Sequence, residues 1–317
     1  MIKKRYLGLI ISAVCVMVAV SVANINVQAQ QDSVQLAISP QVLDIQVNPG
    51  DVTTNQFRLT NGSDTAITVK AIPKNFTPQG EDGAIDLTQD DTSYSVATWL
   101  SALPAEVTIP ANKTQDFTVT MRVPGNAEPG SRFGSVVFAT IPPETAGSGA
   151  RVSQEIAPVI LVTVAGDLVE SAAITDFYAL KSMWSNEPEV ILQARVENKG
   201  NVHFKPTGVV EIFDIFGNSV TKVSLEDKNV LPESIRKIDA KWPIDGFKIG
   251  KYRAELTIVY GNDDQIVTAK TNFWIIPYQT IVPIAIGTLL VGFLVLRYRS
   301  RIALAFRVLS GKDTESK

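Results

Sequence analysis

Short runs in which apolar and polar residues alternate constrain the fold of this chain more than any other feature. Between Gln35 and Phe273 such runs recur, for example at Gln56–Thr60, Gln115–Val123 and Tyr252–Ile258. Successive side chains of a β-strand point to opposite faces, so period two is typical of antiparallel strands that bury one face. Because turn-forming Gly, Pro and Asn clusters separate the runs at close intervals, we expect an all-β region of β-sandwich type.

The order of features in the first half of this region is repeated in the second half. A strand that ends in the turn Asn61-Gly62-Ser63 corresponds to one that ends in Asn198-Lys199-Gly200, and a Gly-containing turn later opens a long strand in each half. About 240 residues are more than one sandwich usually holds. We predict two immunoglobulin-like modules, at residues 30–168 and 169–274.

The N-terminus has the pattern of a secretory signal peptide. Lys3, Lys4 and Arg5 precede an apolar stretch, and small residues at Val27 and Ala29 fit a cleavage site. We therefore assign residues 1–29 to a signal peptide. An uncleaved signal anchor is the alternative, although its apolar run is short for a membrane span.

A second apolar segment lies near the C-terminus. Residues 275–296 carry no charge and reach about 33 Å as a helix, enough to cross a hydrocarbon core of about 30 Å. We predict a transmembrane helix here rather than a buried globular helix. The predicted interface residues are Trp274, Tyr278, Arg297, Arg299 and Arg301. Because arginines favour the cytoplasmic side, residues 297–317 form a basic cytoplasmic tail. The bulk of this single-pass cell-membrane protein is then extracellular.

Charge and cysteine content exclude several kinds of partner and chemistry. Between Gln30 and Leu296 there are 20 basic and 30 acidic residues, so this part carries a net charge of about −10. Such a field disfavours a nucleic-acid partner. The single cysteine, Cys15, lies in the predicted signal peptide. The mature protein would have neither a disulfide nor thiol chemistry.

Two segments of the first module are predicted to be long loops, where sandwiches often place binding surfaces. Asn75–Tyr94 carries the candidate ligand-binding residues Asp82, Asp86 and Asp90, and Pro142–Val152 contains the candidate Gly147. Together with Glu81 and Asp91 these carboxylates could coordinate calcium. They lack the Asp-x-Asp-x-Asp-Gly spacing, so we favour a solvated acidic loop and predict no metal or cofactor.

The four tryptophans are candidates for stacking on sugar rings. Trp184 lies in a polar stretch and is kept as a ligand-binding candidate, whereas Trp99 and Trp242 have the surroundings of core residues.

Catalysis is not expected. The single histidine, His203, follows a turn and is interpreted as a loop or strand-face residue, and the chain contains none of the common hydrolase, zinc or phosphate-loop motifs.

A set of short segments, most of them turns, recurs in a characteristic order over about residues 32 to 300. The segments are Val47–Gly50, Leu59–Ser63, Gly83–Asp86, Trp99 ahead of Pro104–Ile109, Val123-Pro124, Pro129-Gly130, Gly134, Glu197–His203 and Pro206–Gly208. They resemble the bacterial WxL-interacting protein family, whose members have a signal peptide, two immunoglobulin-like modules and a C-terminal membrane helix. The resemblance implies that the first module contacts peptidoglycan and that the second docks surface proteins of WxL type.

The expected function is therefore binding. The first hypothesis is a membrane-anchored scaffold that links a surface protein and peptidoglycan or another cell-wall polymer to the membrane. The alternative is an extracytoplasmic assembly chaperone, which would hold its client at an exposed, unpaired, apolar edge strand. An enzyme is the least favoured class.

Overall fold

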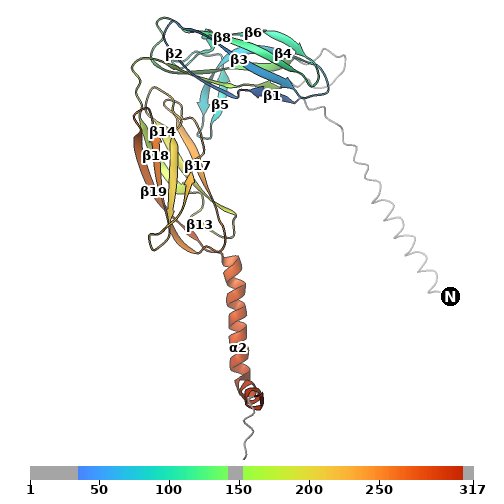
Figure 1. Cartoon of the computed structure of the whole chain (residues 1–317), viewed down its shortest axis with the longest axis vertical. Coiled ribbons are helices and arrows are strands. Elements are labelled where there is room, and N and C mark those ends of the chain that lie inside the picture. Colours follow the sequence, from blue (N-terminus) through green and yellow to red (C-terminus); the bar gives the residue numbers. More distant parts are fainter. Residues whose placement is uncertain (1–34, 142–152, 310–317) are drawn as a thin grey trace, which may run out of the picture.

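The computed structural model describes residues 35–141 and 153–309. Figure 1 shows two bodies of β-structure followed by one long helix. The expectation of mainly β-structure with an apolar helix near the C-terminus is confirmed for these residues. The predicted signal peptide, the loop Pro142–Val152 with Gly147, and the end of the predicted tail after Leu309 lie outside the described residues.

The N-terminal sandwich, defined here as residues 36–164, consists of two facing sheets. One has the strand order β1-β3-β8-β6, and the other β2-β11-β9-β4-β5, with β10 beside β9 and β7 beside β4. Strand β2 runs parallel to β11. The elements are β1 (Leu36–Ser39), β2 (Val42–Val47), β3 (Val52–Asn61), β4 (Ile67–Gln79), β5 (Ala84–Thr88), η1 (Ala97–Trp99), β6 (Leu100–Leu103), β7 (Glu106–Ile109), β8 (Thr114–Arg122), β9 (Gly130–Ile141), β10 (Glu155–Ile156) and β11 (Val159–Val164).

The alternating residues of these strands form the core between the two sheets. In β8, the buried residues Phe117, Val119 and Met121 are separated by partly buried threonines. Phe117 meets Phe138 of the facing sheet edge-to-face, with ring centroids 4.7 Å apart, an arrangement that aromatic pairs prefer. Period two in the sequence therefore identified the core face of this strand.

The C-terminal sandwich, defined as residues 172–275, also consists of two sheets. Their strand orders are β12-β14-β17 and β13-β19-β18-β15-β16. Its buried residues form a core cluster separate from that of the N-terminal sandwich. The strands are β12 (Ala172–Ala179), β13 (Met183–Trp184), β14 (Glu189–Asn198), β15 (Thr207–Phe213), β16 (Ser219–Ser224), β17 (Ile235–Pro243), β18 (Gly250–Tyr260) and β19 (Gln265–Ile275).

The tryptophans occupy different environments in the two cores. Trp242 is buried and meets Tyr252 at 5.4 Å between ring centroids, as expected for a core residue. Trp99 is partly buried against the N-terminal core. Trp184, predicted as a sugar-stacking candidate, is buried. The exposure expected of Trp184 is therefore contradicted, because β13 pairs with the end of β19 and places the indole in the C-terminal core, although the flanking residues are polar.

The C-terminal helix α2 (Tyr278–Leu309) begins three residues after the start of the predicted span. Trp274 and Ile275 still pair with β18, so the strand delays the start of the helix. Among the described residues this is the one helix long and apolar enough to cross a membrane, over Tyr278–Arg299. Trp274 and Tyr278 are exposed where the helix begins, and Arg297 and Arg299 are exposed near the other end of this span. Arg301 follows on the helix.

The two core clusters allow a test of whether each sandwich is an independent folding unit, as the sequence predicts. Phe138→Ala empties part of the N-terminal core and should cost about 3–5 kcal/mol of unfolding free energy, and Leu256→Ala in the C-terminal core about 2–5 kcal/mol. Calorimetry of the full chain should show two transitions, of which each substitution lowers one. Equal shifts of both transitions by either substitution would mean a single cooperative unit.

Candidate functional site at the junction of the sandwiches

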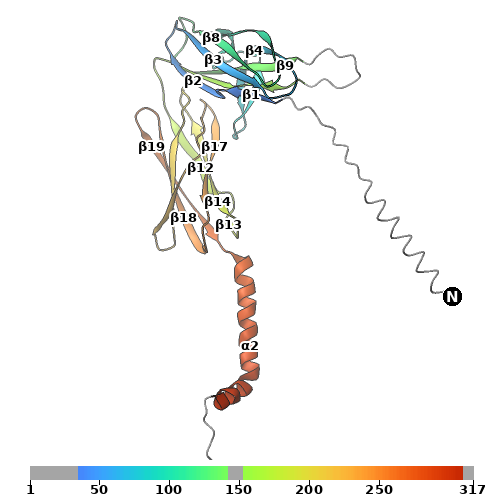
Figure 2. The same ribbon diagram turned by 45° about the vertical axis from the view of Figure 1, so that its right-hand side comes forward.

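The segment Asn75–Tyr94, expected as a long loop, is largely a β-hairpin. Strand β4 continues into it and pairs with β5 in antiparallel register. Gly80 and Gly83 lie in the connecting turn at φ values of 62° and 86°, which glycine adopts without strain. The loop prediction is wrong because Ile85 and Leu87 alternate with polar residues. Both pack on a small apolar cluster on the outer face of the sheet, the face turned away from the core between the two sheets. In Figures 1 and 2 this hairpin reaches toward the C-terminal sandwich.

The hairpin disperses the acidic residues that the sequence places close together. Asp82 is exposed in the turn, Asp86 is exposed on β5, and Asp90 is exposed beyond the strand. Asn75 fixes the last segment through its Nδ2, which donates to Asp90 O (3.1 Å) and to Asp91 Oδ1 (3.0 Å). Within the described part of the chain, no three His, Cys, Asp or Glu side chains are grouped so that they could hold a metal ion. The calcium alternative therefore gains no support from these residues.

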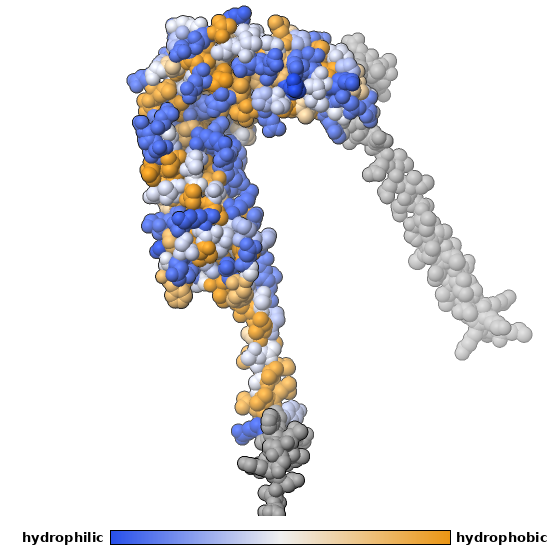
Figure 3. Space-filling model, in the orientation of Figure 1, coloured by the Kyte–Doolittle hydropathy of each residue, from blue (hydrophilic) through white to orange (hydrophobic). Residues whose placement is uncertain are grey.

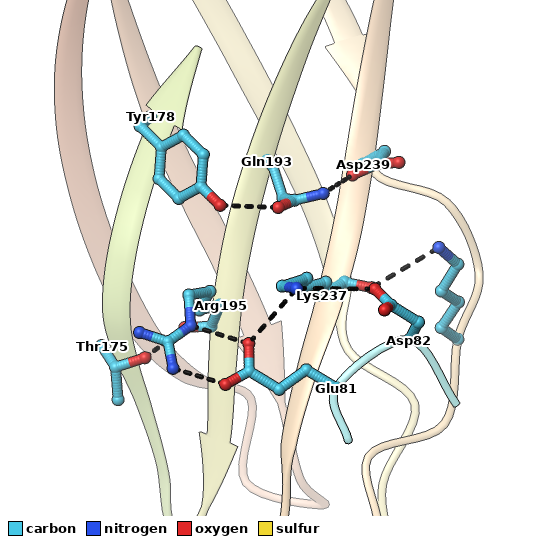
Figure 4. Close-up of polar contacts among 9 residues, drawn as sticks. Glu81, Asp82, Thr175, Tyr178, Gln193, Arg195, Lys237 and Asp239 are labelled. Carbon is cyan, nitrogen blue, oxygen red and sulfur yellow. Dashed lines mark hydrogen bonds and ion pairs between the residues drawn. The ribbon is translucent and has the colours of Figure 1, made fainter. Parts of the chain in front are cut away.

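Glu81, at the tip of the hairpin, joins the two sandwiches (Figure 4). Its carboxylate accepts hydrogen bonds from Nε (2.8 Å) and Nη2 of Arg195 on β14. Its backbone carbonyl accepts the N–H of Lys237 on β17 at 2.9 Å. The Arg195 hydrogen bonds lower the pKa of Glu81 and raise the pKa of Arg195. A two-point arginine–carboxylate contact fixes orientation as well as distance, so the hairpin tip is held in one position on the C-terminal sandwich.

His203 makes a second, buried connection. Its backbone N–H donates to Ser131 Oγ of β9 (2.7 Å), and the same oxygen lies 2.6 Å from His203 Nδ1. If the Ser131 hydroxyl donates its hydrogen bond to Nδ1, the ring proton is carried by Nε2. Nε2 lies 3.1 Å from Asp44 Oδ1 on β2. This arrangement satisfies both ring nitrogens, so one histidine of the C-terminal sandwich is tied to two strands of the N-terminal sandwich.

Ser131, His203 and Asp44 have the composition of a hydrolase triad, but their geometry does not suit that use. Ser131 is fully buried, and its oxygen already accepts the backbone N–H of His203. Asp44 and His203 line a cavity of about 240 Å³ whose walls do not include Ser131. A nucleophile must reach its substrate. The arrangement therefore serves to link the sandwiches, not to transfer acyl groups.

Asn201 fixes the connection between β11 and β12, where the predicted module boundary at residues 168/169 falls. The backbone N–H of Val169 donates to Asn201 Oδ1 (2.8 Å), and Asn201 Nδ2 donates to Asp167 O (3.2 Å). The Asn201 carbonyl accepts the N–H of Ser131 (2.8 Å). A Cβ on Gly130, at φ 117°, would lie 2.7 Å from that carbonyl oxygen. Glycine is therefore required for this approach, and the connection is bound to both sandwiches.

A groove opens at this junction, with a volume of about 490 Å³. Its apolar floor is the outer face of the N-terminal sheet, formed by Val42, Phe76, Ile85, Val159 and Leu161. The C-terminal sandwich contributes Leu231 and a polar rim formed by Lys205, Asp227, Lys228, Asn229 and Arg236. Burial lowers the pKa of Arg236, and its Nε has no hydrogen-bond partner among the described residues. We call this cavity the junction groove.

Comparison with known proteins gives distant structural neighbours. No protein-family model and no curated protein matches the chain. The class 5 fimbriae chaperone CfaA is similar over 77% of this chain and 100% of its own, at 16% identity and a TM-score of 0.40. The E. coli chaperone DraB is similar over 76% of this chain and 95% of its own, at 12% identity and a TM-score of 0.34. A chaperone–tip adhesion subunit complex of Acinetobacter baumannii Csu pili is similar over 64% of this chain and 89% of its own, at 15% identity and a TM-score of 0.34. These identities and TM-scores are too low to transfer a function to this chain.

The contact between Glu81 and Arg195 should make the junction sensitive to acid. Because the folded protein lowers the pKa of Glu81 from its ordinary value of 4.5, this contact contributes fully above that value and is lost as the pH falls through the lowered value. Glu81→Gln should loosen the junction at neutral pH and remove part of its response to acid. Spin labels at Val52→Cys and Thr257→Cys, one on each sandwich, would report this as a broader distance distribution.

Asp82→Asn is the matched control for that measurement. Asp82 is exposed, and its Oδ1 lies 3.7 Å from Lys237 Nζ, so this substitution should leave the distance distribution unchanged. Identical distributions for Glu81→Gln and the unmodified protein would show that the Glu81 carboxylate does not hold the junction.

Proposed function

We propose that this chain is a membrane-anchored binding protein that presents the junction of its two sandwiches to a protein partner outside the membrane. The observation that carries the proposal is the junction groove, which takes its floor from one sandwich and its rim from the other. Contacts through Glu81 and His203 hold the two walls together. A preformed apolar groove with a few placed polar groups is typical of a binding site.

The extent of the groove favours a polypeptide partner. Its floor includes residues of β2 and β5, the two end strands of the sheet order β2-β11-β9-β4-β5. At about 4.8 Å between neighbouring strands, this corresponds to roughly 19 Å. An extended segment of about six residues covers that length at about 3.3 Å per residue. The charged rim would then select the partner by its polar groups.

The edge of the sheet favours the assembly chaperone as one form of this function. Strand β2 pairs on one side only within the described structure, with β11, and its Val42 is 48% exposed at the groove. An unpaired edge with an apolar side chain can accept an added strand. A scaffold would use the same surface but keep its partner bound.

The family resemblance adds cell-wall polymer and a WxL-type surface protein as proposed partners. Asp82, Asp86 and Asp90 remain exposed on the N-terminal sandwich and available for contact with peptidoglycan. Trp184 does not, because its indole is buried in the other sandwich. The net charge of about −10 between Gln30 and Leu296 makes a nucleic-acid partner unfavourable.

Photocrosslinking from the groove tests the proposed protein contact. A photoreactive residue in place of Asp227, on the exposed rim, should give discrete crosslinks to protein in cells that produce the full chain. The control position is Thr257, exposed on β18 away from the groove, and it should give few crosslinks. Equal crosslinking from both positions, or none from Asp227, would contradict the proposal.

The lifetime of the crosslinked complex separates the two forms of the function. After a pulse of labelled synthesis, a chaperone should crosslink new partner molecules and then lose them during the chase, because the partner is handed on. A scaffold should keep a constant amount of partner bound. Crosslinked partner that persists through the chase would exclude a transient assembly role.

The proposed topology places the sandwiches outside the cell and the tail inside, anchored by α2. Protease added to intact cells without their wall should digest the sandwiches and spare a tag placed after Lys317, because the bilayer shields it. Permeabilised cells serve as the control, since there the tag should be lost as well. Digestion of the tag in intact cells would reverse the orientation.

A further inference from the structure

Exposed apolar side chains gather at the end of the C-terminal sandwich from which α2 leaves. Large exposed hydrophobic residues lie in several connections at this end, whereas elsewhere in the sandwich only Val209 and Ile266 are of this kind. Figure 3 shows hydrophobic surface at this end, beside the helix. The residues concerned are Leu180, Met183, Ile215, Phe216, Phe247, Ile249 and Trp274.

The strand register places these connections at one level. Phe213, just before the β15–β16 turn, pairs with Arg253, and Gly250, just after the β17–β18 connection, pairs with Ile275 at the end of β19. Met183 pairs with Trp274. The tips therefore lie at the same end of the sandwich as the point where the chain passes from β19 into α2.

The most exposed of these tips is held in place. Phe216 is 81% exposed in the turn between β15 and β16. Asp214 Oδ1 accepts the backbone N–H groups of Phe216 (2.8 Å) and Asn218 (2.9 Å), and Gly217 N–H donates to Asp214 O (3.1 Å). Such a side-chain-capped turn has little freedom to fold its apolar residue back onto the sandwich. The hydrogen bonds of the turn therefore keep the Phe216 side chain exposed to solvent.

The connection to α2 fixes how far this end lies from a bilayer. Two residues, Ile276 and Pro277, separate β19 from the helix, so the gap is at most about 10 Å. The Ile276 N–H donates to Trp184 O (2.8 Å), and Asn186 Nδ2 donates to Gln279 Oε1 (3.3 Å), which ties the first helical turn to the sandwich. The headgroup layer on each side of a hydrocarbon core is roughly 5–8 Å thick. A helix that enters the core near Tyr278 therefore leaves the sandwich end at headgroup level.

We infer that the tips Ile215-Phe216 and Phe247–Ile249 insert into the outer leaflet and seat the C-terminal sandwich on the membrane. This inference rests on the proposed anchoring by α2. Apolar side chains on exposed tips bind the boundary between headgroups and acyl chains, and Lys248 and Lys251 beside Phe247 can extend to the headgroups. Trp274 and Tyr278 at the same level are residue types enriched at this interface. Continuity with the helix favours lipid over a protein as the occupant.

Depth-dependent quenching tests the contact in the full chain, reconstituted in vesicles of phosphatidylcholine and phosphatidylglycerol with Cys15→Ser as background. An environment-sensitive dye at Ile215→Cys should be quenched at least twofold by lipids that carry a nitroxide near the headgroup. Dye at Asp263→Cys, in the turn at the opposite end of the sandwich, should not be quenched. Dye at Leu290→Cys in α2 should be quenched by a nitroxide deep in the acyl chains.

Further variants separate the possible outcomes. Phe216→Ser with Phe247→Ser should reduce the quenching at position 215 at least twofold, whereas Val209→Ser, an exposed position on the same sheet, should leave it unchanged. Quenching at position 290 without quenching at 215 would overturn the seating and preserve the anchor, and would leave the tips for a protein partner. Quenching at 215 without quenching at 290 would support the lipid contact and overturn the spanning helix. Absence of both would overturn both.

Discussion

The buried contact between Ser131 and His203 is the constraint on which the arrangement of the two sandwiches depends. A single hydroxyl meets the backbone N–H and the ring of His203, and the adjacent Asn201 carbonyl accepts the Ser131 N–H. Leaving such buried polar groups without partners would cost about 1–3 kcal/mol each. Separation of the sandwiches therefore has to break several buried hydrogen bonds together, so the folded sandwiches keep one relative arrangement.

The junction groove follows from this constraint. Neither sandwich alone encloses the cavity, since Phe76 and Leu161 form its floor and Leu231 and Arg236 face them from the other side. The hairpin tip at Glu81 sets the spacing of the two walls through Arg195. Binding at the groove would not have to bring the two sandwiches together, which reduces the ordering that association requires.

The sequence predicted the strands well because burial of one face leaves a direct mark on the pattern of residues. Period two located the core face of β8, and the uncharged segment located α2. The contacts at the junction produce no comparable pattern in the sequence. Glu81 belongs to an acidic run in the sequence, and only the hairpin register brings it to Arg195, 114 residues away. The single histidine beside the turn at Asn201 was the available signal, but its partner Ser131 is 72 residues distant. Trp184 was misread because its neighbours are polar while its own side chain faces inward.

The placement of the two ends of the C-terminal sandwich has a mechanical consequence. Strand β12 starts at the junction and β19 ends two residues before α2, so a pull between the N-terminal sandwich and α2 runs along the strands. Hydrogen bonds of antiparallel strands stand perpendicular to that direction, so the eleven residue pairs between β18 and β19 are loaded together in shear. Resistance to force depends on the unfolding rate, and this rate is low when many hydrogen bonds have to break together. A sandwich loaded in this way can resist tension between the N-terminal sandwich and α2 without any covalent crosslink.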